Sequence, residues 1–294
     1  MIPSGFVYVA GAAAACVGAL ALLAALDRDR AFAAVWAALR RRSHAAVAPL
    51  RRAALAMALA LTTDDDCKAV GAMALRPAAP PLPPPGRLLE VLELGAGFGD
   101  CVSELVAAVA AANVRAANSR SSQGGRNADG DAPRLRRITL VEPNTRFHAA
   151  LRSMAVAAAA APAAVRLLGC GGEDMAAAGV ENGSVDLIFS HLVLCSCPAQ
   201  AGVLAAAWRA LRPGGRLVVV EHVRGAAGSA ALMAQRAISL SGLWALFGGG
   251  CRLDRDTGAA LVAAGPWARL ELREVAARGV PFFLQPHIVA VAER

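Results

Sequence analysis

The sequence lacks the even number of regularly spaced cysteines that a disulfide framework needs. Its 294 residues contain seven, and an odd number scattered along a long chain argues against a disulfide framework. The nearest pair, Cys195 and Cys197, has no second Cys or His pair at the spacing of a zinc finger. We therefore expect buried free thiols in a reducing compartment and no metal site. No residue stands in a pattern typical of a covalent nucleophile.

A basic surface covering the whole protein is also missing. The net charge is +8, but residues 1–60 carry +5 and residues 113–137 carry +4, which leaves the rest of the chain near −1. Proteins that bind nucleic acid concentrate positive charge on the binding face of the folded domain. We therefore expect no nucleic-acid partner, and nothing in the composition indicates an oligomeric state.

The segment Gly5–Leu26 has no charged residue, no proline and no side-chain amide. At about 1.5 Å per residue, a helix of this length can cross a hydrocarbon core of roughly 30 Å. Arginines follow the segment, so the positive-inside rule predicts an anchor that leaves the rest of the chain in the cytosol. The next stretch, Phe32–Leu61, alternates apolar patches with arginine and contains no acids, as in an amphipathic helix on a membrane.

The same arginine-rich, acid-poor start is also typical of an organellar transit peptide. Both interpretations stay open: a membrane anchor through residues 5–26 with residues 32–61 on the membrane surface, or a segment removed on import. A stiff, proline-rich linker follows at Pro77–Gly86. The expected domains are an anchor and amphipathic segment at 1–63, a linker at 64–86, and a catalytic domain at 87–294 with a low-complexity insertion at 113–137.

From residue 87 onward, short apolar runs alternate with helical segments, which indicates a parallel sheet covered on both faces. No long helix separates the last two strands, so they should form an antiparallel hairpin. The expected strands are Leu88–Leu94, Ile138–Glu142, Val165–Leu168, Val185–Ser190, Arg216–Glu221, Leu270–Val275 and Phe283–Ala292. The expected helices are Val102–Ala112, Thr145–Ala159, Ala199–Leu211, Ala230–Phe247 and Arg255–Ala264.

A glycine-rich turn, Gly95-Ala96-Gly97-Phe98-Gly99, follows the first expected strand. Glycine allows the tight turn and the close approach of a ligand. The spacing is G-x-G-x-G, whereas a dinucleotide fingerprint would place its third glycine at position 100, which is Asp100. Glu93 precedes the turn, and an acid there can hold the cationic amino group of a ligand.

A second acid, Glu142, ends the next expected strand and is followed by Pro143. A carboxylate at this place can accept both hydroxyls of a ribose, although it can also cap the helix that follows. Glu173 and Asp174 follow the third expected strand and can accept an exocyclic amine, while Met175 offers an apolar face to a ring.

Together these segments resemble the class I S-adenosylmethionine-dependent methyltransferases, and most closely the membrane-anchored thiol S-methyltransferases of endoplasmic reticulum and lipid droplets. The resemblance covers about residues 87–294. It implies a seven-stranded Rossmann-like α/β sheet, S-adenosyl-L-methionine as the cofactor, and cofactor contacts at Gly95, Gly97, Glu142 and Asp174. The segments that carry the resemblance are Glu93–Gly99, Val141–Asn144, Gly172–Met175, Leu192–Ser196, Leu211–Gly215, Glu221–Val223, Gly250–Leu253 and Pro286–Ile288. The full set of expected cofactor-binding residues is Glu93, Gly95, Ala96, Gly97, Gly99, Glu142, Pro143, Glu173, Asp174, Met175 and His191.

The expected acceptor is a small lipophilic molecule such as an alkyl thiol, methylated at a membrane. A thiol reacts as its thiolate, so a base would help, and His222 and His191 both lie at expected strand ends. Each histidine could be that base, shape the pocket or be purely structural. Two other functions stay open: C- or O-methylation of a quinone, sterol or other lipid, and a non-catalytic scaffold on a membrane or lipid droplet.

Overall fold

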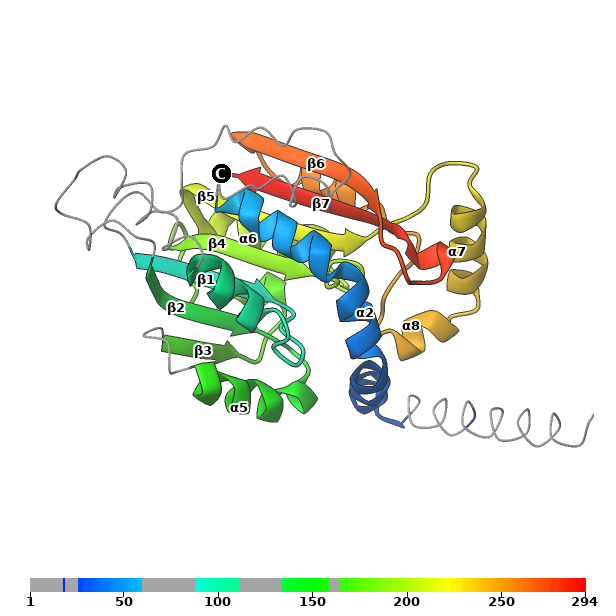
Figure 1. Cartoon of the computed structure of the whole chain (residues 1–294), viewed down its shortest axis with the longest axis horizontal. Coiled ribbons are helices and arrows are strands. Elements are labelled where there is room, and N and C mark those ends of the chain that lie inside the picture. Colours follow the sequence, from blue (N-terminus) through cyan, green and yellow to red (C-terminus); the bar gives the residue numbers. More distant parts are fainter. Residues whose placement is uncertain (1–17, 19–25, 60–87, 111–133, 159–163) are drawn as a thin grey trace, which may run out of the picture.

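The computed structural model describes residues 18, 26–59, 88–110, 134–158 and 164–294, which form a layered α/β structure around a seven-stranded sheet (Figure 1). The strand order is β3-β2-β1-β4-β5-β7-β6. Strands β1 to β5 run parallel to one another, and β7 runs antiparallel to both β5 and β6, which confirms the expected final hairpin. The strands are β1 Leu88–Leu94, β2 Arg134–Val141, β3 Ala164–Leu168, β4 Val185–His191, β5 Leu211–His222, β6 Arg269–Ala276 and β7 Pro286–Glu293.

Helices cover both faces of this sheet. One expected helix, Ala230–Phe247, is broken in two at Gly242, whose φ of 69° is left-handed and ends α7 as glycine commonly does. The helices are α2 Arg28–Ala58, a helix at residues 102–110, α5 His148–Ala158, α6 Gln200–Ala210, α7 Ala230–Leu240, α8 Leu243–Phe247 and α9 Thr257–Ala263. Three single 3-10 turns are η1 Thr145–Phe147, η2 Gly172–Asp174 and η3 Phe282–Leu284.

The two-residue period of the strands divides the core into two layers. Leu89 and Val91 of β1 pack in one cluster with the helix at 102–110, α5 and α2. Leu92 and Leu94 of the same strand point to the other face and pack beneath α6 and α9. Strands buried on both faces, such as β1 and β4, are therefore mainly apolar in sequence, which is why the sheet can be recognised from the sequence.

The second half of α2 belongs to this core. Leu50, Leu55 and Ala58 are buried there, and the helix contacts β5 and β7 (Figure 1). The buried guanidinium of Arg216 on β5 donates a hydrogen bond to the Ala58 carbonyl at the end of the helix. We expected residues 32–61 to lie on a membrane and the folded domain to begin near residue 87. The structure instead includes α2 in the domain, because its alanines and leucines form a face that packs on the sheet.

Several expectations concern residues outside the described part of the chain. The apolar segment 5–26 lies outside it except for Gly18 and Leu26, and so do residues 60–87 and 111–133. In the part that is described, no helix is both long enough and apolar enough to span a bilayer. The insertion expected at 113–137 is too long at its far end, because β2 begins at Arg134 and pairs with β1 from there onward.

Candidate active site

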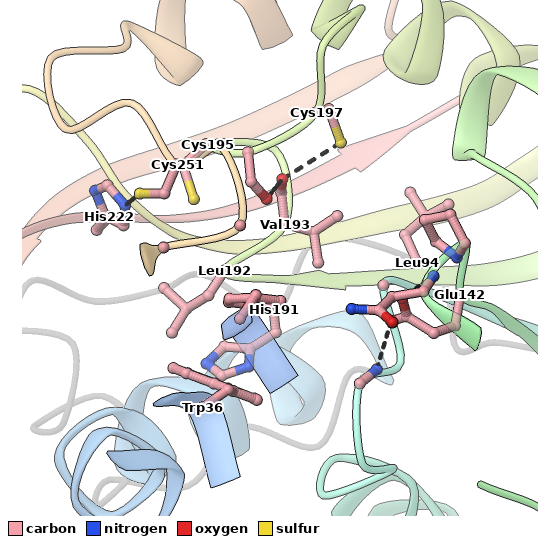
Figure 2. Close-up of a pocket in the computed structure, with 18 of the residues that line it drawn as sticks. Trp36, Leu94, Glu142, His191, Leu192, Val193, Cys195, Cys197, His222 and Cys251 are labelled. Carbon is pink, nitrogen blue, oxygen red and sulfur yellow. Dashed lines mark hydrogen bonds between the residues drawn. The ribbon is translucent and has the colours of Figure 1, made fainter. Parts of the chain in front are cut away.

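A cavity of about 1280 Å³ opens at the carboxyl ends of the parallel strands (Figure 2). Ligand sites of open α/β sheets lie at this edge. Its wall includes the glycine turn after β1, the residues that follow β2, β3 and β4, and His222 at the end of β5. The first half of α2 and the segment around α8 complete the enclosure.

The glycine turn takes the left-handed backbone that its residues suggest. Gly95 and Gly97 have φ angles of 60° and 53°, and the Gly95 amide donates to the Val141 carbonyl at 2.8 Å. A Cβ on Gly97 would meet only the indole nitrogen of Trp36, at 3.8 Å, and the oxygen of Gly95, so the turn offers its backbone to the cavity. Gly97 is therefore suited to close approach by a ligand.

Gly99 has a different role from the one expected. It is absent from the described residues that line the cavity. Its φ is 78°, and a Cβ there would come within 2.7 Å of Met154 on α5. Gly99 therefore lets α5 pack against the turn.

Glu142 fixes the turn from the neighbouring strand. One carboxylate oxygen accepts a hydrogen bond from the backbone amide of Gly97 at 2.8 Å, and the other accepts one from the backbone amide of Asn144 at 2.9 Å. Burial raises the pKa of Glu142, and the two amide hydrogen bonds act in the opposite direction. Each carboxylate oxygen has a second lone pair, so the carboxylate retains two acceptor positions for the hydroxyls of a ribose.

Glu93 places an unpartnered acceptor at the wall of the cavity. The residue is 3% exposed and lines the cavity, and its Oε2 atom has no hydrogen-bond partner among the described residues. Burial raises the pKa of Glu93 to about 8. A buried, unpartnered carboxylate oxygen is costly unless a ligand satisfies it. The amino group of an amino-acid ligand fits this place.

The acids after β3 lie at the rim of the same cavity. Glu173 is half-buried and Asp174 is exposed, and both line the cavity together with Pro143 and Ala96. Met175 does not: it is 1% exposed and packs in the core beneath α6. The turn η2 ends just before it and carries consecutive side chains to different sides, so the expected contact of Met175 with a ligand ring is not found.

His191 lines the cavity and is held by two neighbours. Its Nε2 lies 3.4 Å from a nitrogen of Arg51, and its Nδ1 lies 3.6 Å from the sulfur of Cys101. Because a guanidinium can only donate hydrogen bonds, Nε2 is the accepting nitrogen and its lone pair is engaged. Arg51 is in turn bound by both oxygens of Glu104 at 2.6 and 2.8 Å. This arrangement favours a positioning role for His191 over a catalytic base.

His222 lies apart from His191, beside two cysteines (Figure 2). Its Nε2 is 2.9 Å from the sulfur of Cys251, and the ligand atoms of Cys195, His222 and Cys251 all lie within 4.8 Å of one another. The hydrogen bond with Cys195 has the largest effect on the pKa of Cys251 and lowers it, and His222 lowers it further. From the sequence we expected no metal site, because Cys195 and Cys197 have no second Cys or His pair at the spacing of a zinc finger.

Other residues of the site were missed by the sequence reasoning. Phe32 and Trp36 of α2 line the cavity, as does His287 of β7. The aromatic pair recurs four positions apart on one helix face, a signal that could have marked a packed surface. Asn144, which lies beside Glu142, donates from its side-chain amide to the carbonyl of Asp29 at 3.0 Å, so α2 is fastened directly to the site.

The strand order, the glycine turn and the acids at the strand ends are typical of class I S-adenosylmethionine-dependent methyltransferases. Residues 120–219 match a family model described as "Methyltransferase domain". A domain of this class implies S-adenosylmethionine as the cofactor, and the open acceptors of Glu93 and Glu142 fit its amino group and its ribose.

Among proteins of known activity, the chain is similar to human thiol S-methyltransferase TMT1A, with 32% identity over 156 residues. It is also similar to rat thiol S-methyltransferase TMT1B, with 36% identity over 121 residues. The matches cover 53% and 41% of this chain and 62% and 48% of those relatives. The match with a solved S-adenosylmethionine-dependent methyltransferase from Thermotoga maritima covers 88% of this chain and 98% of that chain, with 15% identity and a TM-score of 0.46. The sequence matches confirm the resemblance to thiol S-methyltransferases.

Proposed function

We propose that this protein transfers a methyl group from S-adenosylmethionine to the sulfur of a small lipophilic thiol. The observation that carries the proposal is the unpartnered oxygen of Glu93 beside a glycine turn fastened by Glu142, both facing one cavity. Glu93 supplies an acceptor for the amino group of the cofactor, and Glu142 supplies acceptors for the hydroxyls of its ribose. The thiol as acceptor is supported by the similarity to TMT1A and TMT1B.

The size and lining of the cavity support a lipophilic acceptor beside the cofactor. Its volume of about 1280 Å³ exceeds the range of about 300–1,000 Å³ usual for a single ligand. Much of the remaining wall is apolar and aromatic. The side chains of this kind include Phe32, Trp36, Ile238, Phe247 and Leu284.

The bound cofactor would supply an already activated methyl group on a sulfonium, so the chain's own residues have two tasks. They hold the donor and the acceptor in one orientation, because keeping the reacting atoms in line contributes strongly to the reaction rate. They also exclude water, and α2 does this by placing Trp36 above the glycine turn. The acceptor sulfur must be deprotonated to react, because the thiolate is the nucleophile.

The decisive experiment incubates the purified full chain with methyl-labelled S-adenosylmethionine and a panel of alkyl thiols, quinones and sterols. We expect label in thioethers and none in the other two classes. Label in a quinone or a sterol alone would assign a C- or O-methyltransferase instead. Absence of both methyl transfer and S-adenosylhomocysteine binding, measured by calorimetry, would leave a non-catalytic scaffold as the function.

Replacing Glu142 with alanine should weaken S-adenosylhomocysteine binding by about 10- to 100-fold. The change removes the acceptor for the ribose and leaves the amides of Gly97 and Asn144 unpaired, and a hydrogen bond to a charged group is worth about 1.5–3 kcal/mol. Calorimetry on Glu142→Ala beside the exposed-site control Glu181→Ala measures this. Equal affinity in the two variants would refute the ribose assignment.

Binding at Glu93 should depend on pH. The folded-state pKa of about 8 lies above the reference value of 4.5, so the free protein prefers the neutral acid and loses stability as pH rises between these values. A cationic amino group favours the carboxylate, so S-adenosylhomocysteine should bind more tightly as pH rises toward 8. Binding at pH 7 should also release a proton.

Calorimetry in two buffers of different ionisation enthalpy detects that proton. The variant Glu93→Gln cannot ionise and should show neither the release nor the pH dependence between pH 6 and 8. If the wild type released no proton at pH 7, or if the variant behaved like it, Glu93 would not be the group that meets the amino end.

We also propose that the protein is held at a membrane of the endoplasmic reticulum or lipid droplets through residues 5–26, with the catalytic domain in the cytosol. The support is the uncharged segment and the arginines after it. Carbonate extraction of membranes compares the full chain with one beginning at Leu26, and only the full chain should resist extraction. Recovery of a mature protein without residues 1–60 inside an organelle would show that the segment is a transit peptide.

A further inference from the structure

We propose that Cys195, His222 and Cys251 bind a zinc ion whose fourth position faces the cavity and takes the acceptor thiol. Zinc binding stands on the three residues alone. The role of the fourth position rests on the proposed thiol methylation.

The three side chains are arranged as a metal site requires. Their ligand atoms lie within 4.8 Å of one another, and all three residues are buried. Bond lengths of about 2.3 Å to sulfur and 2.0–2.1 Å to nitrogen place tetrahedral ligand atoms roughly 3.5–4 Å apart. The cluster therefore needs only small side-chain movements to hold an ion, including a widening of the 2.9 Å between His222 Nε2 and the Cys251 sulfur. Figure 2 shows both sulfurs beside the His222 ring, at the end of the cavity away from Glu142.

The backbone holds these residues in place from three separate elements. His222 is the last residue of β5, and Cys195 lies in the turn after β4. Cys251 follows a tight turn in which Gly249 and Gly250 have φ angles of 62° and 90°. The amide of Arg252 donates to the carbonyl of Cys195 at 3.0 Å and joins the two cysteine segments.

The surroundings also suit a thiolate ligand. The indole N–H of Trp244 donates to the sulfur of Cys251 at 3.2 Å, the kind of outer hydrogen bond that orients a metal ligand. His222 Nε2 faces the Cys251 sulfur and is the nitrogen available to a metal, whereas Nδ1 is buried and has no hydrogen-bond partner among the described residues. Cys197 is not part of it, because its thiol faces the Val193 carbonyl at 3.3 Å.

The donor set points to zinc with one open position. Two thiolates and one imidazole suit zinc, and a site with three protein ligands keeps its fourth place for water or substrate. His287 lies near, with its ring centroid 6.3 Å from that of His222, but its Nδ1 donates to the Gln285 carbonyl and it falls outside the group of mutually close ligand atoms. All three proposed ligands line the same cavity as the glycine turn.

This site would supply the deprotonation that the proposed reaction needs. When the acceptor binds, its S–H bond breaks, a Zn–S bond forms and the proton leaves to solvent water, because zinc deprotonates a coordinated thiol. The zinc-bound sulfur then forms the bond to the methyl carbon. The carbon–sulfonium bond breaks, and its electron pair stays on the cofactor sulfur. No further base is required, which agrees with the engaged lone pair of His191.

The first test measures metal in the purified full chain by mass spectrometry after dialysis against micromolar zinc. We expect about one zinc per chain in the wild type and in the control Cys197→Ser. We expect a loss of at least tenfold in Cys195→Ser and Cys251→Ser. Calorimetry with S-adenosylhomocysteine shows whether each variant is folded.

The second test needs no variant. Cobalt(II) replaces zinc in the wild type, and two cysteine ligands should give a thiolate-to-cobalt charge-transfer band that changes when an alkyl thiol is added. Wild-type protein that takes up neither metal, or zinc retained in the double variant C195S/C251S, would overturn the site. Metal uptake without a spectral response to the thiol would overturn the role of the fourth position.

The two proposals can fail separately. Stoichiometric zinc in a protein that methylates no thiol would refute the proposed function and leave the metal site. Methylation of thiols by a protein that takes up no zinc would support the proposed function and refute the metal site.

Discussion

A chain that begins at residue 87 should not fold, whereas a chain that begins at Leu26 should fold and bind S-adenosylhomocysteine. The longer deletion removes Val47, Leu50 and Leu55, which are buried against the sheet. Burying one such side chain is worth about 1.5–3 kcal/mol, and a whole domain is stable by only about 5–15 kcal/mol. Arg216 and Glu104 would also lose the partners they find on α2. Circular dichroism melting and calorimetry of both chains measure this.

Two point variants isolate the contribution of α2 without deleting anything. Leu55→Ala should cost about 2–5 kcal/mol, as large-to-small changes in a packed core do. Arg52→Ala, on the exposed side of the same helix, should change stability little. A cooperative melt and normal cofactor affinity in the chain that begins at residue 87 would mean that α2 lies outside the folded domain, as the sequence first suggested.

Gly95→Ala should abolish detectable S-adenosylhomocysteine binding. The residue has a φ of 60°, and an added Cβ would come within 2.2 Å of a methyl group of Val193. Relieving that overlap requires the turn after β1 or the turn after β4 to move, and both line the cavity. We expect affinity to fall by at least 100-fold, because both walls of the cofactor position shift.

Gly183→Ala is the matched control for that experiment. Gly183 also has a left-handed φ, 67°, but a Cβ there meets nothing within 4 Å. The control should therefore show only the backbone cost of about 1–2 kcal/mol and should keep its affinity for S-adenosylhomocysteine. Equal loss of affinity in the two variants would show that the overlap with Val193 has no part in the effect.

The sheet could be predicted because each strand carries its own signal. Leu88–Leu94 is a mainly apolar run before a glycine turn, and the structure gives β1 these same bounds. Gly95, Gly97 and Glu142 could be placed at the cavity for the same reason, since a strand end and the turn after it are local features. Helix α2 could not be placed this way. A face of alanine and leucine looks the same whether it packs on lipid or on a sheet, and nothing local shows that Arg51 meets Glu104.

The cluster of Cys195, His222 and Cys251 had no local signal at all. Each residue lies in a different loop or strand end, and only the order of β4 and β5 in the sheet brings two of them together. The predicted ligand contact of Met175 was wrong although its local signal was clear. Its neighbours Glu173 and Asp174 do line the cavity, but the turn η2 directs the next side chain into the core.

The buried carboxylate of Glu221 positions the turn after β4 relative to the glycine turn after β1. Glu221 on β5 accepts hydrogen bonds from the amides of Val193 and Leu194 through a single oxygen, at 2.8 and 3.0 Å. Those bonds fix the turn after β4, whose Leu192 has a positive φ of 55°, and they press Val193 against Gly95. The glycine turn after β1 and the turn that carries Cys195 thus contact each other through the backbone of Gly95 and the side chain of Val193.

In the proposed reaction, the separation between methyl donor and methyl acceptor would therefore be set mainly by the backbone of these two turns. A displacement of about 1 Å between reacting groups can cost about 10²-fold in rate. With this spacing, the proposed thiol acceptor would be selected by how far its sulfur reaches along the cavity. Chain length and branching next to the thiol, more than overall hydrophobicity, should then order the substrates.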